Sequence, residues 1–371
     1  MVVQPRVIIH GWGALEHLPR VARSLGTRAL LVVGKSFARR SGYLDRIVSM
    51  LRSAGVSVEV FEGVEPNPRE STCEAIASRI RGSRADMVVA FGGGSVIDAA
   101  KAGAVVASLG GRVRDYFYPR TVAEPVKPII AIPTTCGTGS EVTRYAVITT
   151  EDGSKKLTVV GDSIVPYAAI LDHEALTHLP KNLVAWTALD ALSHALEAYI
   201  TRRPTELSDS YALRAVEMIL DSIHGGVWGG RESLERLHIA SMLAGMAINA
   251  VGTNIVHAMG YYLTVKHGAH HGLANAVIMP YALSETIKAV SRPRLERLLR
   301  IFGCESIECF EKRLLRLCES LGVPTSLRAI GFEESELQTY VDDVMSYRRN
   351  LENAPISVSR EVIESIARRA L

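Results

Sequence analysis

The sequence has no uninterrupted run of about 18 apolar residues, the length that a membrane-spanning helix needs. Its first residues lack the charged start and long apolar run of a signal peptide. The net charge is only +3 over 371 residues, and lysine and arginine are interspersed with aspartate and glutamate. We therefore expect a soluble cytoplasmic protein that binds neither membranes nor nucleic acids.

Cysteine is also scarce, because the chain has five and they form neither a CxxC pair nor a zinc-ribbon spacing. We expect these cysteines to be buried or free thiols. Whether two of Cys304, Cys309 and Cys318 form a disulfide is not decided by the sequence. The composition, 47% apolar and 22% charged, is typical of an ordered globular protein. A chain of this length is expected to form two domains.

The first half of the chain alternates short apolar runs with segments of helical spacing. The runs at 29–34, 86–91 and 128–133 are typical of buried parallel strands. This alternation predicts an α/β domain with a parallel sheet over residues 1–180. Long helical stretches dominate from about residue 180, so we expect residues 181–371 to form an all-helical domain.

Two polar loops follow predicted strands. Gly92-Gly93-Gly94-Ser95 lies between the strand 86–91 and a helix, where a helix N-terminus offers free N–H groups to phosphate. The segment 134–141, rich in threonine and glycine, follows the strand 128–133. Ligands of open α/β sheets bind beyond such strand ends. The loops predict a nucleotide site, although the first matches neither GxGxxG nor a Walker loop and a tight turn alone stays open.

A carboxylate lies in an apolar helix. The segment 182–200 is apolar on nearly every face, as in a buried helix, yet it contains Asp190 and, one turn later, His194. A buried ionised carboxylate is costly unless it is paired or binds a metal. The pair therefore indicates a metal site. A local pair between the two side chains, or a helix less buried than it looks, remains an alternative.

Four histidines lie close together between residues 257 and 271. His257 is in a helical segment of small residues, and His271 precedes Gly272 and an apolar helix. Together with Asp190 and His194, the side chains of His257 and His271 make a set of one carboxylate and three imidazoles. Such a set suits Fe²⁺, Zn²⁺, Ni²⁺ or Co²⁺. We interpret the histidines outside this neighbourhood as structural or exposed, namely His10, His17, His173, His178, His224 and His238.

Four segments together resemble the iron-containing alcohol dehydrogenases, also called the group III family. They are GGGSVIDAAK (92–101), IPTTCGTGSEVT (132–143), LDALSHALEAY (189–199) and VHAMG with HHGLANAVIMP (256–280). The resemblance implies a dehydroquinate synthase-like fold, with a Rossmann-like dinucleotide-binding domain at 1–180, an all-helical metal-binding catalytic domain at 181–371, and the active site in the cleft between them. It also implies NAD(P)(H)-dependent hydride transfer between a primary alcohol or polyol and its aldehyde or ketone.

The resemblance assigns roles residue by residue. The family's metal ligands match Asp190, His194, His257 and His271. Iron is the family's default metal, and zinc suits the same ligands. The positions implied for the cofactor are Gly93, Gly94 and Ser95 at the pyrophosphate with Asp98 nearby, Thr134, Thr135 and Thr138 on the adenine and phosphate side, and Lys156 at the ribose.

The chain departs from the family pattern after the strand 29–34. Many members have an aspartate there that binds the adenosine 2′-hydroxyl and repels a 2′-phosphate. This chain has Gly34, followed by Lys35 and Ser36, with Arg39 and Arg40 close by. A missing carboxylate beside positive charge favours a phosphate dianion. We therefore predict that NADP(H) is preferred over NAD(H).

Two further departures concern the reaction. Many members have a second histidine four residues after the third ligand, and this chain has Tyr261 there. Tyr261 or His267 is the candidate replacement for that histidine in proton relay. Ile248 stands where a phenylalanine is common in the substrate pocket, which predicts a wider pocket.

The sequence leaves some alternatives open. One is a zinc-dependent enzyme similar to glycerol or glycerol-1-phosphate dehydrogenase, and another is dehydroquinate synthase. A third is a non-catalytic nucleotide-binding protein on the same fold. We expect a small-molecule substrate, and a homo-oligomer stays open.

Overall fold

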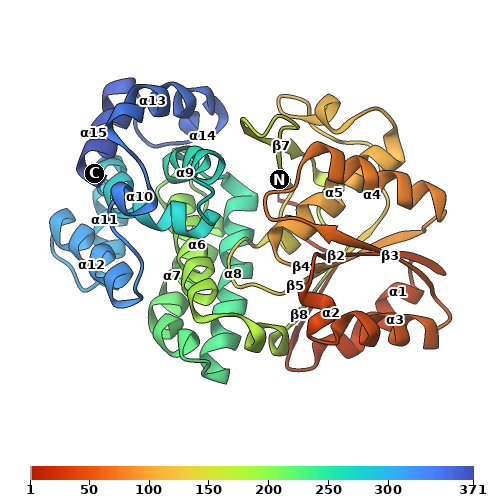
Figure 1. Cartoon of the computed structure of the whole chain (residues 1–371). Helices are drawn as coiled ribbons and strands as arrows, with labels where there is room; N and C mark the ends of the chain where they lie inside the picture. Colours follow the sequence, from red (N-terminus) through yellow and green to blue (C-terminus); the bar gives the residue numbers. More distant parts are fainter. Residues whose placement is uncertain (1) are drawn as a thin grey trace. The chain divides into compact units, whose positions relative to one another are not determined.

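The computed structural model describes residues 2–371. The chain separates into two compact units, with the division between Leu179 and Pro180 (Figure 1). The first unit contains all the strands, and the second consists of helices. This is the predicted combination of an α/β N-terminal half and a helical C-terminal half, and the fold class is therefore confirmed.

The first unit is built on a six-stranded sheet with the order β1-β8-β5-β4-β2-β3, and every neighbouring pair is parallel. Its strands are β1 (Val7–Gly11), β2 (Arg28–Gly34), β3 (Ser57–Val64), β4 (Met87–Gly92), β5 (Ile129–Pro133) and β8 (Ala168–Asp172). A separate antiparallel hairpin consists of β6 (Tyr145–Thr149) and β7 (Lys156–Val160). The sequence analysis did not predict β6, β7 or β8.

Helices cover both faces of this sheet (Figure 1). They are α1 (Leu18–Arg23), α2 (Phe37–Arg40), α3 (Tyr43–Ser53), α4 (Glu70–Gly82) and α5 (Gly94–Leu109). Successive side chains of a strand point to opposite faces. In β2, Leu30 and Val32 therefore pack against α4 and α5, whereas Leu31 and Val33 pack against α1, α2 and α3. A strand buried on both faces explains the continuous apolar run in its sequence.

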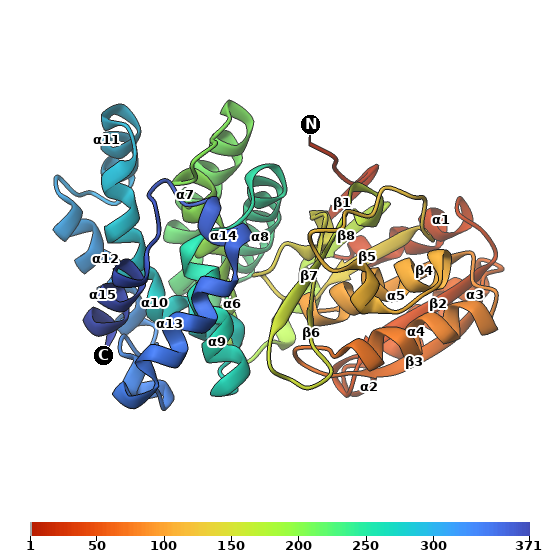
Figure 2. The ribbon, with the colours of Figure 1, turned by 90° about the horizontal axis from the view of Figure 1, so that it is seen from above.

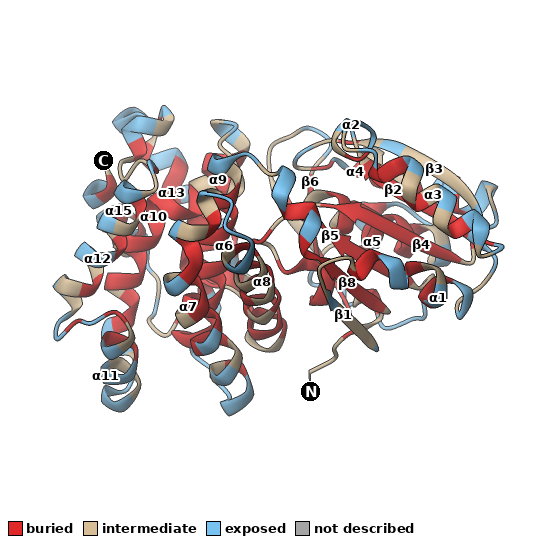
Figure 3. Ribbon diagram, turned by 90° about the horizontal axis from the view of Figure 1, so that it is seen from below, coloured by how far each residue is buried: buried red, intermediate tan, exposed pale blue. Residues whose placement is uncertain are grey.

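The second unit is all-helical. Its helices are α6 (Lys181–Tyr199), α7 (Glu206–Val227), α8 (Arg231–Val251), α9 (Ile255–Lys266), α10 (His271–Thr286), α11 (Arg292–Ile301), α12 (Ile307–Ser320), α13 (Leu337–Ser346), α14 (Arg348–Glu352) and α15 (Arg360–Ala370). Helix α6 packs against α7, α8 and α10 and is buried without interruption from Thr187 to Tyr199 (Figures 2 and 3). The apolar sequence of this helix on nearly every face follows from that burial.

Short 3₁₀ helices complete the chain. They are Ala14–His17, Val113–Tyr116, Ser140–Val142, Asp162–Ile164, His173–His178, Ile287–Ala289, Leu327–Ile330 and Glu334–Glu336. Within residues 2–371, no single helix is both long and apolar enough to cross a membrane. The helices α8 and α9 meet that length and composition only as a pair, and they are bent by 110° at their junction.

The cysteines differ in state. Cys304 and Cys309, on either side of the start of α12, form a disulfide. Cys73, Cys136 and Cys318 are buried free thiols. The bond left open between two of the three C-terminal cysteines is thus present, and the expectation of thiols holds for the other three.

Candidate active-site residues

The two polar loops of the first unit lie side by side, because β4 and β5 are neighbours in the sheet. The N–H of Thr134 donates to the carbonyl of Gly92 over 3.1 Å. A Cβ added to Gly94 would lie 2.5 Å from Cγ2 of Thr138, and one added to Gly93 would lie 3.3 Å from Cγ2 of Thr135. A side chain at Gly94 would therefore push the two loops apart.

Helix α5 starts at Gly94 directly after the first loop, and no side chain caps its N-terminus. The first N–H groups of a helix have no partner within the helix and attract anions. Ser95, in the first turn, accepts a hydrogen bond at Oγ from the backbone N–H of Asn67 over 3.3 Å. The loop and the helix start together have the geometry of a phosphate site.

Two side chains of α5 hold the second loop. Asp98 accepts hydrogen bonds from Oγ of Ser140 and from the N–H of Val147. Lys101 is fully buried, and its Nζ donates to the backbone carbonyls of Ser140, Thr143 and Tyr145 over 2.6, 2.8 and 2.9 Å. Burial lowers the pKa of Lys101 to about 8, although Asp98 opposes that shift. Asp98, expected near the cofactor, thus connects the loops, and the sequence analysis missed Lys101.

Glu141 follows Ser140 in the second loop and was also missed. It is 2% exposed, and its Oε1 has no hydrogen-bond partner within residues 2–371. Burial raises the pKa of this carboxyl to about 7, against the opposing effect of Lys101. A carboxyl in this position is desolvated, so its ionised form is costly.

The residues predicted to select the cofactor surround the end of β2. Lys35 and Ser36 are exposed after Gly34. The guanidinium of Arg39 pairs with both oxygens of Glu62, over 2.6 Å from Nη2 and 3.0 Å from Nε, so its charge is matched locally. Lys156, predicted at the ribose, is buried in β7. Lys35 therefore offers a more available positive charge at this strand end than Arg39.

In the second unit, the four predicted metal ligands lie together. Asp190 and His194 come from α6, His257 from α9, and His271 is the first residue of α10. Oδ1 of Asp190 lies 3.8 Å from Nε2 of His257 and 4.0 Å from Nε2 of His271. Nε2 of His194 lies 2.8 Å from Nε2 of His257. Helix α6 and the two consecutive helices α9 and α10, far from it in the sequence, thus direct one carboxylate and three imidazoles to one place.

The chemistry and spacing of this cluster fit a divalent ion. Ligand atoms that are each about 2.1 Å from an ion lie about 3 to 3.5 Å apart. The separations here are 2.8 Å for His194 to His257, and 3.8 and 4.0 Å for Asp190 to His257 and His271, so they lie on either side of that range. The ligand atoms of Asp190, His257 and His271 all lie within 4.8 Å of one another. Asp190 is 2% exposed; burial would raise its pKa, but His194 and the other two imidazoles lower it below the usual range. The carboxylate is therefore ionised, as a metal ligand must be.

Two glycines let the helices approach this closely. A Cβ on Gly272 would lie 2.2 Å from the backbone oxygen of Trp186 and 3.2 Å from Cβ of Asp190. A Cβ on Gly260 would lie 2.0 Å from Oδ1 of Asn275. The start of α10 can therefore contact α6 and α9, which brings His271 beside Asp190.

Two buried residues contact the ligands from outside, and the sequence analysis missed both. Nδ2 of Asn275 donates to Oδ1 of Asp190 over 2.8 Å. The carboxylate of Glu197 bonds to Nδ1 of His257 and accepts the N–H of Val256 over 2.7 Å. Glu197 is seven residues after Asp190 in an apolar helix, so its polar character on the same helix face was the available signal.

The two candidates for proton relay have different surroundings. The ring of Tyr261 stacks on His271, with centroids 5.7 Å apart and an angle of 13° between the rings. Nε2 of His267 lies 3.1 Å from Oε2 of Glu336, and its ring contacts Tyr262. Tyr261 is thus next to the cluster, whereas His267 belongs to another group of side chains. Ile248, expected at the substrate pocket, is buried in α8.

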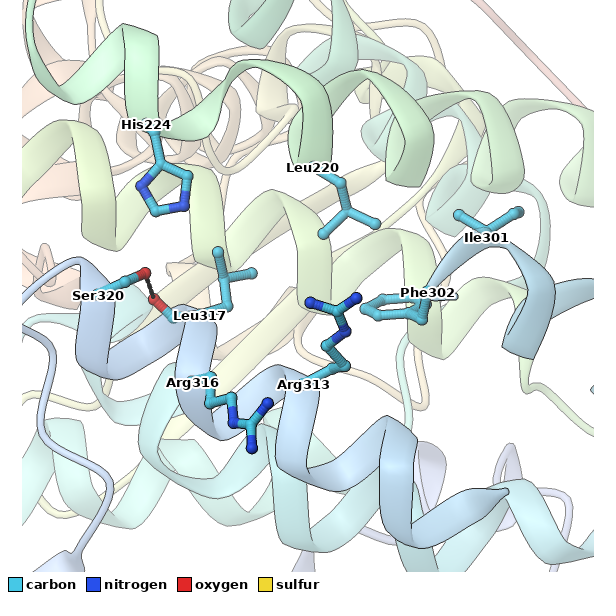
Figure 4. A pocket seen from close by; sticks show the side chains of 8 residues that line it. All are labelled: Leu220, His224, Ile301, Phe302, Arg313, Arg316, Leu317 and Ser320. Atoms are coloured by element: carbon cyan, nitrogen blue, oxygen red, sulfur yellow. Dashed lines mark hydrogen bonds between the residues drawn. The ribbon is translucent and has the colours of Figure 1, made fainter. Parts of the chain in front are cut away.

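A hollow of about 380 Å³ in the second unit is lined by residues of α7, α11 and α12 and by Phe302 (Figure 4). Its lining residues are Leu220, His224, Ile301, Phe302, Arg313, Arg316, Leu317 and Ser320. None of the four candidate ligands lines this hollow. His224 is exposed there, in agreement with the sequence interpretation, and the hollow is not where we expect the reaction.

Comparison with known proteins assigns the class. Residues 5–173 match the family model "Iron-containing alcohol dehydrogenase", and residues 184–371 match "Fe-containing alcohol dehydrogenase family, C-terminal". The chain therefore belongs to the iron-containing alcohol dehydrogenase family, as the resemblance predicted. It is accordingly an oxidoreductase that interconverts alcohols and aldehydes.

Individual relatives agree with this assignment over nearly the whole chain. An NADPH-dependent butanol dehydrogenase of Clostridium saccharobutylicum is 33% identical, with 91% of this chain and 88% of the relative covered. An NAD-dependent methanol dehydrogenase of Bacillus methanolicus is 30% identical, with 90% of each covered. The solved alcohol dehydrogenase of Oenococcus oeni superposes with a TM-score of 0.94 at 29% identity and complete coverage of both chains.

Proposed function

We propose that Asp190, His194, His257 and His271 hold the divalent metal of this enzyme, with Fe²⁺ as the expected ion and Zn²⁺ compatible with the same ligands. The observation that carries this proposal is the convergence of these four buried or half-buried side chains from α6, α9 and α10. When bound, such an ion supplies Lewis-acid polarisation of an alcohol or carbonyl oxygen. The second unit, residues 181–371, is accordingly the proposed catalytic domain.

We propose that residues 1–180 form the dinucleotide-binding domain. The backbone N–H groups of Gly93, Gly94 and Ser95 at the start of α5 would bind the pyrophosphate, because that helix N-terminus has no side-chain cap. Thr134, Thr135 and Thr138, in the adjacent loop, would contact the adenine and phosphate side, and Lys156 the ribose. The nicotinamide of a bound cofactor donates or accepts the hydride.

We further propose a preference for NADP(H). Gly34 has no carboxylate to repel a 2′-phosphate, and exposed Lys35 and Ser36 supply a positive charge and a hydroxyl beside it. Arg39 contributes less than the sequence suggested, because Glu62 already pairs with it. The relatives include one named for NADPH and one named for NAD, so the family assignment alone does not decide between the two cofactors.

The preference is tested by comparing kcat/KM with NADPH and with NADH on the same aldehyde. We expect the value with NADPH to be higher. A tenfold higher value with NADH would contradict the proposal and would leave the metal assignment untouched.

We propose a primary alcohol or polyol as the substrate, with Tyr261 as the group that holds a proton near the reacting oxygen. Its ring stacks on His271 and also lies 5.0 Å from the ring of Tyr347. These contacts hold the phenol ring beside the candidate metal ligands, and tyrosine is one of the side chains that act as general acids or bases. His267, whose contact is with Glu336, is the weaker candidate.

The function as a whole is tested by metal analysis of protein purified without oxygen, combined with a screen of aldehydes for NADPH oxidation. We expect about one equivalent of divalent metal per chain and turnover of small aliphatic aldehydes, both lost after chelation. Chelator-resistant turnover would refute the metal proposal. Activity confined to phosphorylated polyols would favour the glycerol-1-phosphate dehydrogenase alternative.

A further inference from the structure

We propose that Glu197 is a positioning residue for the metal centre, a role that rests on the proposed metal function. Its carboxylate accepts a hydrogen bond from Nδ1–H of His257 and so presents Nε2 of that imidazole, unprotonated, to a metal ion. Glu197 touches His257 and not the reacting atoms. It was not among the residues that the sequence analysis selected.

The placement of Glu197 supports this role. It lies in α6, three residues after His194 and seven after Asp190, and it is fully buried. One carboxylate oxygen bonds to Nδ1 of His257, and the other accepts the N–H of Val256 over 2.7 Å. Both oxygens therefore have partners in the first turn of α9, which makes a buried charge tolerable there.

The tautomer of His257 follows from this contact. A neutral imidazole carries one proton, so a proton on Nδ1 leaves a lone pair on Nε2. Nε2 is the atom that lies 3.8 Å from Oδ1 of Asp190 and 2.8 Å from Nε2 of His194. A carboxylate behind a ligand imidazole also increases the basicity of the ligand atom. Glu197 thus orients the ring and selects the tautomer that can bind a metal.

A purely structural role for Glu197 is the competing explanation. The same region joins α6 to α9 through Asn254, whose Nδ2 donates to the backbone carbonyl of Glu197 over 3.0 Å. Oδ1 of Asn254 accepts the N–H of Ile255 over 2.7 Å and so caps α9. If Glu197 only helped to start α9, a neutral side chain of the same shape would serve equally well.

The substitution Glu197→Gln separates the two roles. A glutamine keeps an oxygen that can accept the N–H of Val256, but its amide would donate to Nδ1 of His257 and favour the proton on Nε2. We expect the dissociation constant for Co²⁺ or Zn²⁺, measured by competition with a chromophoric chelator, to rise about 10- to 100-fold. The visible absorption of the Co²⁺ form should change as well, because the ligand field at His257 changes.

Two companion variants make the result decisive. Asn254→Ala removes the cap of α9 without touching His257, so we expect a lower melting temperature of the metal-free protein. The dissociation constant for Co²⁺ or Zn²⁺ should stay within about threefold of the parent value, which is less than the effect expected for loss of a residue that contacts a ligand. Glu197→Asp keeps a shorter carboxylate, and its metal affinity should lie between those of the parent and Glu197→Gln. The melting temperature of each metal-free variant reports on folding.

The outcomes distinguish the inference from the proposed function. Parent-like metal affinity in Glu197→Gln would overturn the positioning role while leaving the metal site in place. Affinity in Glu197→Asp no better than in Glu197→Gln would also overturn it. A parent protein that binds neither metal would refute the proposed function itself.

Discussion

The proposed nucleotide site consists mainly of backbone groups and hydroxyls, whereas the proposed metal site consists of ligand side chains. In the first unit the loops after β4 and β5 offer backbone N–H groups and hydroxyls, and glycine keeps them close together. In the second unit the candidate ligands are side chains on three separate helices, and the ligand atoms of Asp190, His257 and His271 lie within 4.8 Å of one another. The nucleotide site depends on the path of the main chain, and the metal site depends on the identity of the side chains.

This difference determines how each site should respond to mutation. A ligand side chain cannot be replaced without losing a metal contact, so a single change in α9 should be severe. A loop made of backbone can lose one hydroxyl at little cost, but it should fail when a new side chain fills the space between the loops.

The largest effect is expected for His257→Ala. Removing one imidazole from the cluster should abolish stoichiometric metal binding and reduce turnover to background, since the proposed ion would polarise the reacting oxygen. Metal content by mass spectrometry and steady-state rates measure both losses, with His224→Ala as the control because His224 is exposed in α7 outside the cluster. Full activity in His257→Ala would disprove the ligand assignment.

A smaller effect on turnover is expected for Tyr261→Phe. This change keeps the ring stacked on His271 and removes only the hydroxyl. Loss of a proton-transferring group typically costs about 10²- to 10⁴-fold, so kcat should fall by at least about 10²-fold while the metal content stays constant. His267→Ala is the comparison, and a larger fall in that variant would transfer the role to His267.

The contrast between the sites becomes sharper with Gly94→Ala. The new Cβ would meet the side chain of Thr138, and overpacking of this kind costs about 1–3 kcal/mol. We expect KM for NADPH, measured from steady-state rates, to rise. The metal affinity, measured by titration, should be unchanged. Gly82→Ala is the matched control, because a Cβ there would meet no atom within 4 Å. Equal effects of both alanines would argue against a packed phosphate loop.

The smallest effect concerns stability and pH. Burial raises the pKa of Glu141 to about 7, above its ordinary value of 4.5. The folded protein therefore holds a proton that the unfolded chain releases between these pH values, and the free energy of unfolding falls as pH rises through that window. Glu141→Gln should remove this fall and raise stability at pH 8 on the order of 2 kcal/mol.

Urea unfolding of the metal-free protein at pH 5 and pH 8 measures this difference. Other groups titrate over the same range, so the informative quantity is the difference between the parent and Glu141→Gln at each pH. The same loss of stability in both proteins between pH 5 and pH 8 would show that Glu141 does not carry the effect.

The parts of the protein that could be predicted from sequence are those with a local signal. The strand 29–34 is an apolar run because both faces of β2 are covered, and Asp190 with His194 stood out because polar side chains are rare in a buried helix. His257 and His271 were joined to that pair by their ligand chemistry, as one carboxylate with three imidazoles, and the family resemblance then gave the same four residues.

The residues that the sequence analysis missed act through partners far away in the chain. Glu197 meets His257 across 60 residues, and Asn275 meets Asp190 across 85. Lys101 resembles an ordinary helix charge until the carbonyls of the second loop surround it. The bond between Cys304 and Cys309 was left open for a different reason, because spacing alone does not set the geometry that a disulfide needs.

Gly260 and Gly272 limit which substitutions the proposed metal site can tolerate. Neither residue offers a metal ligand, yet a single methyl group at Gly272 would collide with the main chain of α6, and one at Gly260 would collide with Asn275. An alanine at either position would therefore disturb the packing of the helices that carry the candidate ligands, although every candidate ligand would still be present. The proposed metal centre therefore needs the absence of two methyl groups as well as the presence of its imidazoles.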